Sequence, residues 1–305
     1  MSDYLEKNRP LVVKPQGLTE MSADWLRWVD ENISRGCSPE SIIDTLVQSK
    51  YDKDYVTKLV FAKLAGEVPA APELLVSGSS DLYKGYDYEE IGIKLSGHVV
   101  KTHDREVNVL LSVDQPRIIL FGNVLSREEC EQMMELSKPK LNQSTTVDNA
   151  SGKAEFHQNR SSRGTFFRIN ETPFITRIDR RVSELMQLPV GNGEGLQILN
   201  YQKGGEYKPH FDYFPPEEIG SKVHIARGGQ RVATLILYLN NVEEGGETIF
   251  PKINLKVTPV QGNAIYFAYT NSKSQVDPLT LHGGCPVVRG EKWISTKWMR
   301  QKEYR

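Results

Sequence analysis

From about residue 90 onward, the chain is a succession of short runs of β-branched and other apolar residues, separated by turns. Such runs predict short strands, and many of them in succession favour two sheets packed face to face. The runs that we expect to form strands are Val107–Val113, Arg117–Phe121, Leu196–Tyr201, Arg231–Leu239 and Ala264–Ala268. Turns are expected at Gly204-Gly205 and Gly245-Gly246. The pattern predicts an α+β protein whose core is a double-stranded β-helix, or jelly roll, with supporting helices.

Two helices are predicted within this strand-rich part. The segment from Ser126 to Glu129 matches a capping box, in which the serine and the glutamate satisfy each other's free backbone amides. A helix should follow to about Leu136, and a second should span Pro173 to Leu188. We expect both helices to pack against the strands.

The first sixty or so residues have helical rather than strand-like spacing. Apolar residues recur every three or four positions after Ser22, which predicts a helix that ends near Gly36. Ser38 and Pro39 suit the cap and the first position of a second helix, and a third is expected over Asp54–Leu64. The stretch that follows is rich in Pro, Ala, Gly and Ser, which is typical of a linker. We therefore predict a small helical domain at 1–65, a linker at 66–90 and a larger domain at 91–305.

Charge and cysteine content limit the partners of the chain. It has 38 Lys and Arg residues against 39 Asp and Glu, a formal net charge of -1. A nearly neutral protein has no general field that attracts nucleic acid or anionic lipid. The first residues also lack an apolar segment typical of a secretion signal. We expect a cytoplasmic protein with no nucleic-acid or membrane partner. Its three scattered cysteines, Cys37, Cys130 and Cys285, are predicted to be free thiols without a catalytic role.

The segment from Tyr207 to Asp212 contains the clearest chemical motif. On an extended strand, residues two positions apart face the same side, so His210 and Asp212 are able to bind one metal ion. A third ligand would complete two histidines and one carboxylate on one face of an octahedral metal, as in non-haem Fe(II) oxygenases. His282 is the best candidate. The other histidines lie in an expected loop or in polar surroundings before the motif: His224, His98, His103 and His157.

Lys292 begins a strand-like alternation in which it shares a face with Ile294, Thr296 and Trp298. A lone cation at the inner end of a barrel requires an anion. A dicarboxylate that binds the metal at one end would place its other carboxylate there. Together with the three candidate metal ligands, Lys292 therefore favours an iron site that also binds a dicarboxylic acid.

Seven features follow one another in a specific order. They are Arg117-Ile-Ile-Leu-Phe, Arg160-Ser-Ser-Arg-Gly164, Asn200-Tyr201-Gln-Lys-Gly-Gly, Tyr207-Lys-Pro-His-Phe-Asp-Tyr, Gly229-Gln-Arg-Val-Ala-Thr-Leu, Glu244-Gly-Gly-Glu-Thr248-Ile-Phe-Pro, and His282 followed by Lys292. In this order they resemble the Fe(II)- and 2-oxoglutarate-dependent dioxygenases, and within that family the prolyl 4-hydroxylases. The resemblance extends over about residues 115–300.

The resemblance implies how iron and cofactor bind. Iron would be held by His210, Asp212 and His282. The distal carboxylate of 2-oxoglutarate would be bound by one cation and two hydroxyl groups, those of Lys292, Tyr201 and Thr248. O2 would be the co-substrate and ascorbate the reductant, with succinate and CO2 as products.

The resemblance also implies a cleft for a proline-containing peptide, lined by Tyr207, Arg231 and Trp298. Its aromatic walls would suit the flat ring of proline. The polar stretch 138–159 should be mobile and, by resemblance, would close over bound peptide, although a passive surface loop is an equal alternative. Arg160 follows this stretch and would bind the substrate backbone or its acidic groups, unless it belongs to a solvated basic edge.

Three other functions stay open. A dioxygenase that repairs alkylated nucleic acid shares the His-x-Asp motif, but it typically holds its cofactor with arginine rather than with a lysine such as Lys292. A second alternative is hydroxylation of another protein residue or of a free amino acid, and Arg300, which stands where relatives can carry a histidine, leaves the substrate open. The third is a binding module with a vestigial site, which the complete set of ligands disfavours. The N-terminal helices are expected to bind a protein partner, to form a dimer contact or simply to pack.

Overall fold

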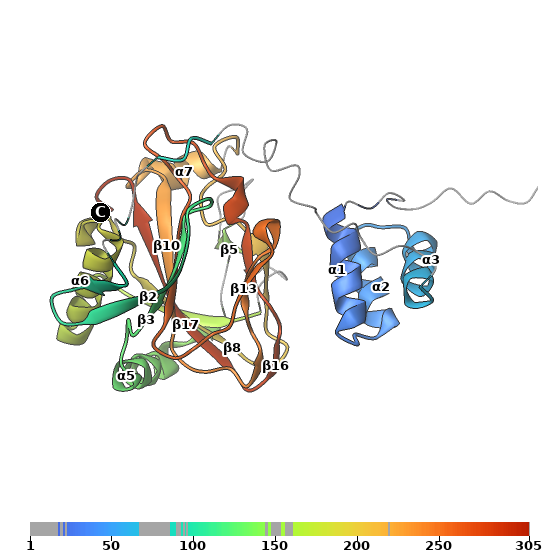
Figure 1. Cartoon of the computed structure of the whole chain (residues 1–305), viewed down its shortest axis with the longest axis horizontal. Coiled ribbons are helices and arrows are strands. Elements are labelled where there is room, and N and C mark those ends of the chain that lie inside the picture. Colours follow the sequence, from blue (N-terminus) through green and yellow to red (C-terminus); the bar gives the residue numbers. More distant parts are fainter. Residues whose placement is uncertain are drawn as a thin grey trace, which may run out of the picture. The chain divides into compact units, whose positions relative to one another are not determined.

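The described residues of the computed structural model fall into two compact units, one before and one after the segment 67–85 (Figure 1). These residues are 18, 21, 23–66, 86–89, 93, 95, 97–143, 146–147, 154–155, 161–218 and 220–304. Most of the predicted linker, 66–90, lies outside them, so the domain boundaries stay predictions. Within the described ranges, no helix is both long enough and apolar enough to cross a membrane.

The smaller unit consists of three helices around a small apolar core. They are α1 (Ala23–Ser34), α2 (Pro39–Gln48) and α3 (Lys53–Leu64). The Ser38 hydroxyl accepts a hydrogen bond from the Ser41 amide at 3.3 Å, so α2 begins at its predicted cap. Asp52 caps α3, which begins one residue before the predicted start. Ser22, the predicted cap of the first helix, lies outside the described residues. The core consists of Val29, Ile42, Ile43, Leu46, Tyr51, Val56 and Val60.

The larger unit contains two facing sheets of antiparallel strands. The nine-stranded sheet has the order β1 (Val99–Lys101), β2 (Glu106–Val113), β3 (Ile118–Gly122), β14 (Ala264–Ala268), β10 (Arg231–Tyr238), β17 (Lys292–Arg300), β8 (Leu196–Tyr201), β7 (Arg163–Phe167) and β4 (Asn142–Gln143). The four-stranded sheet has the order β13 (Leu255–Val257), β12 (Thr248–Phe250), β15 (His282–Gly284) and β9 (Tyr207–His210). Two further pairs join β11 (Glu244–Gly245) to β16 (Val287–Arg289) and β5 (Thr146–Val147) to β6 (Ala154–Glu155). All five predicted strands are present, with bounds that differ by at most one residue.

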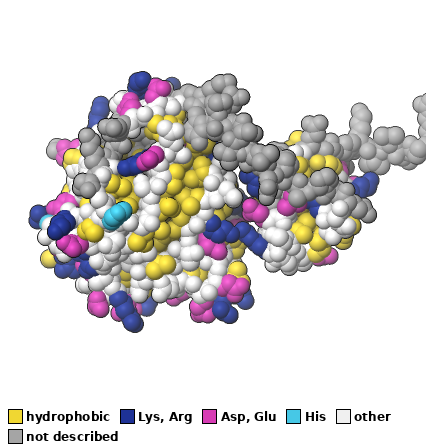
Figure 2. Space-filling model, in the orientation of Figure 1, with side chains coloured by type: hydrophobic (Ala, Val, Ile, Leu, Met, Phe, Trp, Pro, Cys, Tyr) yellow, Lys and Arg dark blue, Asp and Glu magenta, His cyan; other side chains and the backbone are white. Residues whose placement is uncertain are grey.

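Residues along the central strands alternate between two apolar cores. On β10, Leu235 and Leu237 belong to the core shared with α5 (Arg127–Ser137) and α6 (Pro173–Met186). Ile236 and Tyr238 belong instead to the core between the two sheets. Figure 2 shows apolar side chains gathered across the middle of the larger unit and charged side chains around its margin. The period of two along each strand thus builds the predicted jelly roll with helices against one sheet.

Two sequence predictions differ from the structure, and a third is not tested. His224 lies in the short helix α7 (Ser221–Ala226) rather than in a loop, because the glycines of this region flank the segment and do not interrupt it. β9 ends at His210, so Asp212 lies in a bend beyond the strand, where the chain leaves the four-stranded sheet toward β10. The stretch 138–159 contains β4, β5 and β6 and a 3-10 turn at Lys138–Lys140, and its other residues lie largely outside the described ranges, so its mobility stays a prediction.

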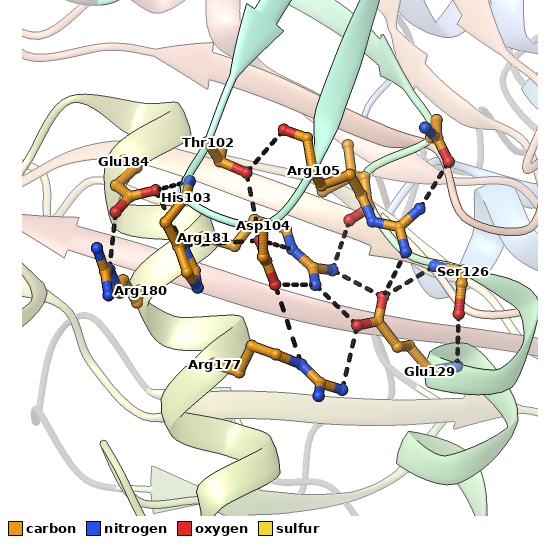
Figure 3. A network of polar contacts seen from close by, with 12 residues as sticks. Thr102, His103, Asp104, Arg105, Ser126, Glu129, Arg177, Arg180, Arg181 and Glu184 are labelled. Atoms are coloured by element: carbon orange, nitrogen blue, oxygen red, sulfur yellow. Dashed lines mark hydrogen bonds and ion pairs between the residues drawn. The ribbon is translucent and has the colours of Figure 1, made fainter.

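A buried ion-pair network joins α6 to α5 and to the turn after β1 (Figure 3). We call Arg181, Asp104 and Glu129 the Arg181 network. Arg181 is 1% exposed, and its five N–H groups donate to both carboxylates and to the Val124 carbonyl oxygen, over 2.6 to 2.9 Å. Glu129 also accepts from the Ser126 amide at 2.9 Å, which confirms the predicted capping box.

None of the three cysteines, all of which the structure describes, forms a disulfide. Cys37 is exposed, whereas Cys130 and Cys285 are buried. Burial raises the pKa of the Cys130 thiol to about 12, so this thiol stays protonated near pH 7.

Candidate active site

Two histidines and one aspartate meet where β9 and β15 pair. His210 ends β9, His282 begins β15, and the two are direct partners in the antiparallel register. With Asp212 they form what we call the metal trio. One ligand atom of each side chain lies within 4.8 Å of those of the other two. No other group of His, Cys, Asp or Glu side chains in the described part of the chain has this arrangement.

Backbone carbonyl groups orient both imidazole rings of the metal trio. Nδ1 of His210 lies 2.9 Å from the Lys208 carbonyl oxygen, and Nδ1 of His282 lies 3.0 Å from that of Thr280. A carbonyl oxygen only accepts hydrogen bonds, so in each neutral ring Nδ1 carries the proton and Nε2 presents a lone pair. The two Nε2 atoms lie 3.6 and 3.5 Å from the Asp212 carboxylate. Two imidazole nitrogens and one carboxylate therefore converge on one point.

Burial and mutual contact set the charges of the trio. Asp212 and His282 are 7% and 3% exposed. Burial opposes ionisation of Asp212, but the imidazoles of His282 and His210 outweigh it and hold the pKa of the carboxyl well below its usual range. Thr234 donates a hydrogen bond of 2.7 Å to this carboxylate. Burial also lowers the pKa of His282 to about 4, so its imidazole is neutral near pH 7.

One cavity connects the metal trio to Lys292. Lys292 is the first residue of β17 and is 4% exposed. Burial lowers the pKa of its ammonium group to about 8. Within the described residues, the Nζ atom forms neither a hydrogen bond nor an ion pair, although it lies near the ring of Tyr201. A buried ammonium without a counter-ion is unfavourable, so this end of the cavity favours an anionic group.

The two predicted hydroxyl groups of the cofactor site line the same cavity. Tyr201 is the partner of Lys292 in the register of β8 and β17, and its ring centroid lies 5.9 Å from Nζ. Thr248 accepts a hydrogen bond of 2.9 Å from the Tyr238 hydroxyl, which leaves its own proton available for donation.

Two predicted substrate residues lie on the metal side of the cavity. Tyr207 stacks on the His210 ring with a centroid distance of 3.6 Å, and both Tyr207 and Trp298 line the cavity. Arg160, another of the four predicted contacts, lies outside the described residues. The structure therefore places two aromatic walls beside the metal trio.

Glu194 holds two arginines next to this aromatic wall. Arg231, a predicted substrate residue, binds both oxygens of Glu194 at 2.7 and 2.9 Å, and its guanidinium lies 4.0 Å from the ring centroid of Trp298. Arg300 is 3% exposed and binds one of the same oxygens at 2.7 Å. It also donates to the backbone carbonyl oxygens of His224 and Gly229. Arg300, whose effect the sequence left open, therefore fixes Glu194 and with it the position of Arg231.

Sequence reasoning missed Thr234, Tyr238 and Glu194, which support Asp212, Thr248 and Arg231. Thr234 had a usable signal, because it is a polar residue within an otherwise apolar strand, and a buried hydroxyl requires a partner. Tyr238 and Glu194 had none, since tyrosine is common in buried strands and Glu194 lies before a strand among glycines.

The site as a whole fits iron and 2-oxoglutarate. Two imidazoles and one carboxylate on one side of a metal are the ligand set of Fe(II) oxygenases, which would leave positions for 2-oxoglutarate and O2. The second carboxylate of 2-oxoglutarate matches the charge of Lys292. Both requirements are met within one cavity.

Comparisons with known proteins agree with this chemistry. The family model described as the 2OG-Fe(II) oxygenase superfamily matches residues 196–300. Probable prolyl 4-hydroxylase 3 of Arabidopsis thaliana is 42% identical over 210 residues, which cover 63% of this chain and 71% of that protein. Prolyl 4-hydroxylase 1 of the same plant is 42% identical over 202 residues, which cover 61% of this chain and 70% of that protein. Among solved structures, the viral collagen prolyl hydroxylase of Paramecium Bursaria Chlorella virus-1 with 2OG is 28% identical, with a TM-score of 0.48, over 60% of this chain and 95% of that chain.

The matched segment contains the complete metal trio, and it also contains Lys292 and Thr248. The identity to the plant proteins extends over more than two thirds of their length. The chain therefore belongs to the 2OG-Fe(II) oxygenase superfamily and, within it, to the prolyl 4-hydroxylase type.

Proposed function

We propose that this enzyme hydroxylates proline residues in peptides or proteins. It uses Fe(II) and 2-oxoglutarate, consumes O2 and releases succinate and CO2, with ascorbate as the expected reductant. The observation that carries the proposal is the single cavity with the metal trio at one end and a buried lysine at the other. The names of the plant relatives support proline as the substrate.

The metal trio would hold iron through Nε2 of His210, Nε2 of His282 and the Asp212 carboxylate. When bound, iron and 2-oxoglutarate supply the oxidising chemistry that replaces a C–H bond by C–OH. The chain supplies position and charge. Backbone carbonyl groups hold both rings with Nε2 facing the metal position, and Thr234 holds the carboxylate.

The far end of the cavity would bind the distal carboxylate of 2-oxoglutarate. Lys292 offers a charge-assisted hydrogen bond in a site that excludes water, and Thr248 and Tyr201 offer hydroxyl groups. The buried cation thereby gains the counter-ion that the described residues do not provide. No side chain of the cavity needs to act as a general base.

Tyr207, Trp298 and Arg231 would position the substrate. The two aromatic rings suit the apolar face of a proline ring. Arg231 makes three hydrogen bonds with described residues, so two of its five N–H groups stay available for substrate carbonyl groups. Arg160 stays part of the proposal as a contact to the substrate backbone.

We also propose that residues 1–65 form a separate helical domain, joined through 66–90 to a dioxygenase domain at 91–305. This domain would bind a protein partner or form a dimer contact. Two exposed apolar residues of α3, Phe61 and Leu64, support such a role. Phe61→Asp should then alter the mass of the complex in solution without altering turnover of a short peptide, and an unchanged mass would contradict the dimer contact.

Mass spectrometry of peptides tests the proposed substrate. An extended proline-containing peptide, incubated with the enzyme, Fe(II), 2-oxoglutarate and O2, should gain one oxygen atom on proline. The same peptide with alanine in place of proline should not react, and His210→Ala serves as the blank enzyme. Formation of succinate without oxidised proline would contradict the substrate and favour another residue or a free amino acid.

A further inference from the structure

Phe166 on β7 is a large aromatic residue that lies mostly in water. It is 54% exposed, whereas its neighbour Phe167 is 1% exposed and belongs to the core beneath the helices. Phe167 pairs with Leu196, another residue of that core. Because side chains alternate along a strand, Phe166 lies on the opposite face of the sheet, the face that carries the cavity.

A row of direct cross-strand partners connects Phe166 to the cavity. Phe166 pairs with Gln197 on β8, Gln197 pairs with Thr296 on β17, and Thr296 pairs with Ile236 on β10. Gln197, Thr296 and Ile236 all line the cavity that contains the metal trio. Phe166 therefore continues the floor of the cavity toward solvent. Two strand spacings separate it from Thr296, a distance of about 10 Å.

Contacts with the described residues do not explain why a large aromatic side chain stands at position 166. Its ring makes no aromatic or cation contact with a described residue, and more than half of its surface stays exposed. Apolar surface left in water does not contribute to folding. A ligand that covers the ring would gain from its burial.

From this position we infer that Phe166 is a positioning residue that binds an apolar ring of the substrate three residues away from the target proline. The inference rests on the proposed hydroxylation of proline. Proline-rich peptides adopt the polyproline II helix, which has three residues per turn and a rise of about 3.1 Å per residue. Residues at positions i and i+3 therefore face the same side, about 9 Å apart. This separation matches the distance from the cavity floor at Thr296 to Phe166, so the enzyme selects a Pro-x-x-Pro spacing.

Paired peptides test this selection. Two test peptides carry the target proline and a second proline, which lies three residues before the target in one peptide and three residues after it in the other. Each test peptide has a control peptide with alanine in place of the second proline. With wild-type enzyme, one of the two test peptides should have a KM roughly 3- to 10-fold lower than the KM of its own alanine control. Phe166→Ala should remove this difference with kcat and the KM for 2-oxoglutarate unchanged, and Phe166→Tyr should restore it.

A matched control separates a local role from a general effect. Leu110→Ala removes an apolar side chain of similar exposure, 53%, from β2 and should leave the peptide preference intact. Equal KM values for all peptides in the wild type, or a preference that survives Phe166→Ala, would overturn the inference while hydroxylation of proline stands. Absence of oxidised proline with every peptide would overturn the proposed function and the inference together.

Discussion

The Arg181 network and the active-site cavity differ in how many of their charged groups have a partner within the chain. In the Arg181 network, every N–H group of one guanidinium is bound to a carboxylate or to a carbonyl oxygen. In the cavity, the Nε2 atoms of His210 and His282 face the Asp212 carboxylate at 3.6 and 3.5 Å, and Lys292 forms no hydrogen bond or ion pair with a described residue. One cluster is complete, and the other is arranged for ligands that the chain does not supply.

The difference distinguishes a stabilising cluster from a binding site. A buried charge that is fully paired is costly to break, because removal of one member leaves the others unpaired. Buried charged groups that lack partners oppose folding, and they are typical of sites that a ligand completes. The Arg181 network should therefore govern stability, and the cavity should govern activity.

The largest expected effect is on turnover. His210→Ala or Asp212→Ala should reduce succinate formation below detection and abolish retention of Fe(II), because each removes one of three metal ligands. The thermal midpoint should change little in His210→Ala, because this partly exposed ring makes a single hydrogen bond, to the Lys208 carbonyl oxygen. His98→Ala, at an exposed histidine, should leave turnover unchanged. Normal turnover by either ligand variant would remove the proposed iron site.

Stability should depend instead on Arg181. Arg181→Met removes a buried guanidinium and leaves the buried Glu129 carboxylate with only its longer contacts to Arg105 and Arg177, so it should lower the free energy of unfolding by about 3 kcal/mol in chemical denaturation. Arg180→Met removes an exposed arginine paired with Glu184 and should cost less than about 1 kcal/mol. Similar losses in the two variants would show that the paired network is not the stabilising cluster.

Removal of the buried cation should weaken cofactor binding. Lys292→Ala should raise the KM for 2-oxoglutarate about 10- to 100-fold, because this factor corresponds to the free energy of one hydrogen bond to a charged group. Fe(II) should still bind. Lys302→Ala, at an exposed lysine, is the matched control. An unchanged requirement for 2-oxoglutarate would disprove the assignment of the carboxylate site.

The smallest effect concerns pH. Burial lowers the pKa of Lys292 to about 8, so in the cofactor-free enzyme the ammonium group is charged below this pH and neutral above it. The affinity for 2-oxoglutarate should therefore be highest below this pKa, where Lys292 is charged. It should fall about fourfold between about pH 7 and pH 8.5 as the ammonium group loses its proton. The folded pKa lies below that of the unfolded chain, so the stability of the cofactor-free protein should rise from about pH 8 to pH 10. In Lys292→Arg the affinity should not depend on pH in this range, and a dependence that persists would assign it to another group.

Local patterns predicted much of the fold and of the metal site. The capping box at Ser126 and the cap at Ser38 depend on neighbouring residues only, and the sequence identifies both helix starts. The alternation on β10 and β17 likewise predicts the strands and the shared face of Lys292 and Trp298. His210 and His282 were recognised as partners although 71 other residues separate them, because ligand chemistry demands a third donor.

Contacts between distant segments could not be predicted in the same way. Nothing near Arg181 in the sequence indicates that Asp104 and Glu129 complete its hydrogen bonds. Glu194 likewise joins Arg231 to Arg300 only after three segments have packed together. The bend that carries Asp212 off β9 also depends on β10, since Thr234 binds the carboxylate there. Such contacts depend on tertiary structure, for which a single sequence has no local signal.

The central claim is that one cavity couples consumption of 2-oxoglutarate to oxidation of proline. The most direct test quantifies succinate and hydroxyproline in the same reaction, with a proline peptide, Fe(II), 2-oxoglutarate and O2. We expect equal amounts of the two products with wild-type enzyme and neither product with His210→Ala. Hydroxyproline formed without the intact metal trio, or succinate formed by the wild type without oxidised proline in any peptide, would contradict the claim.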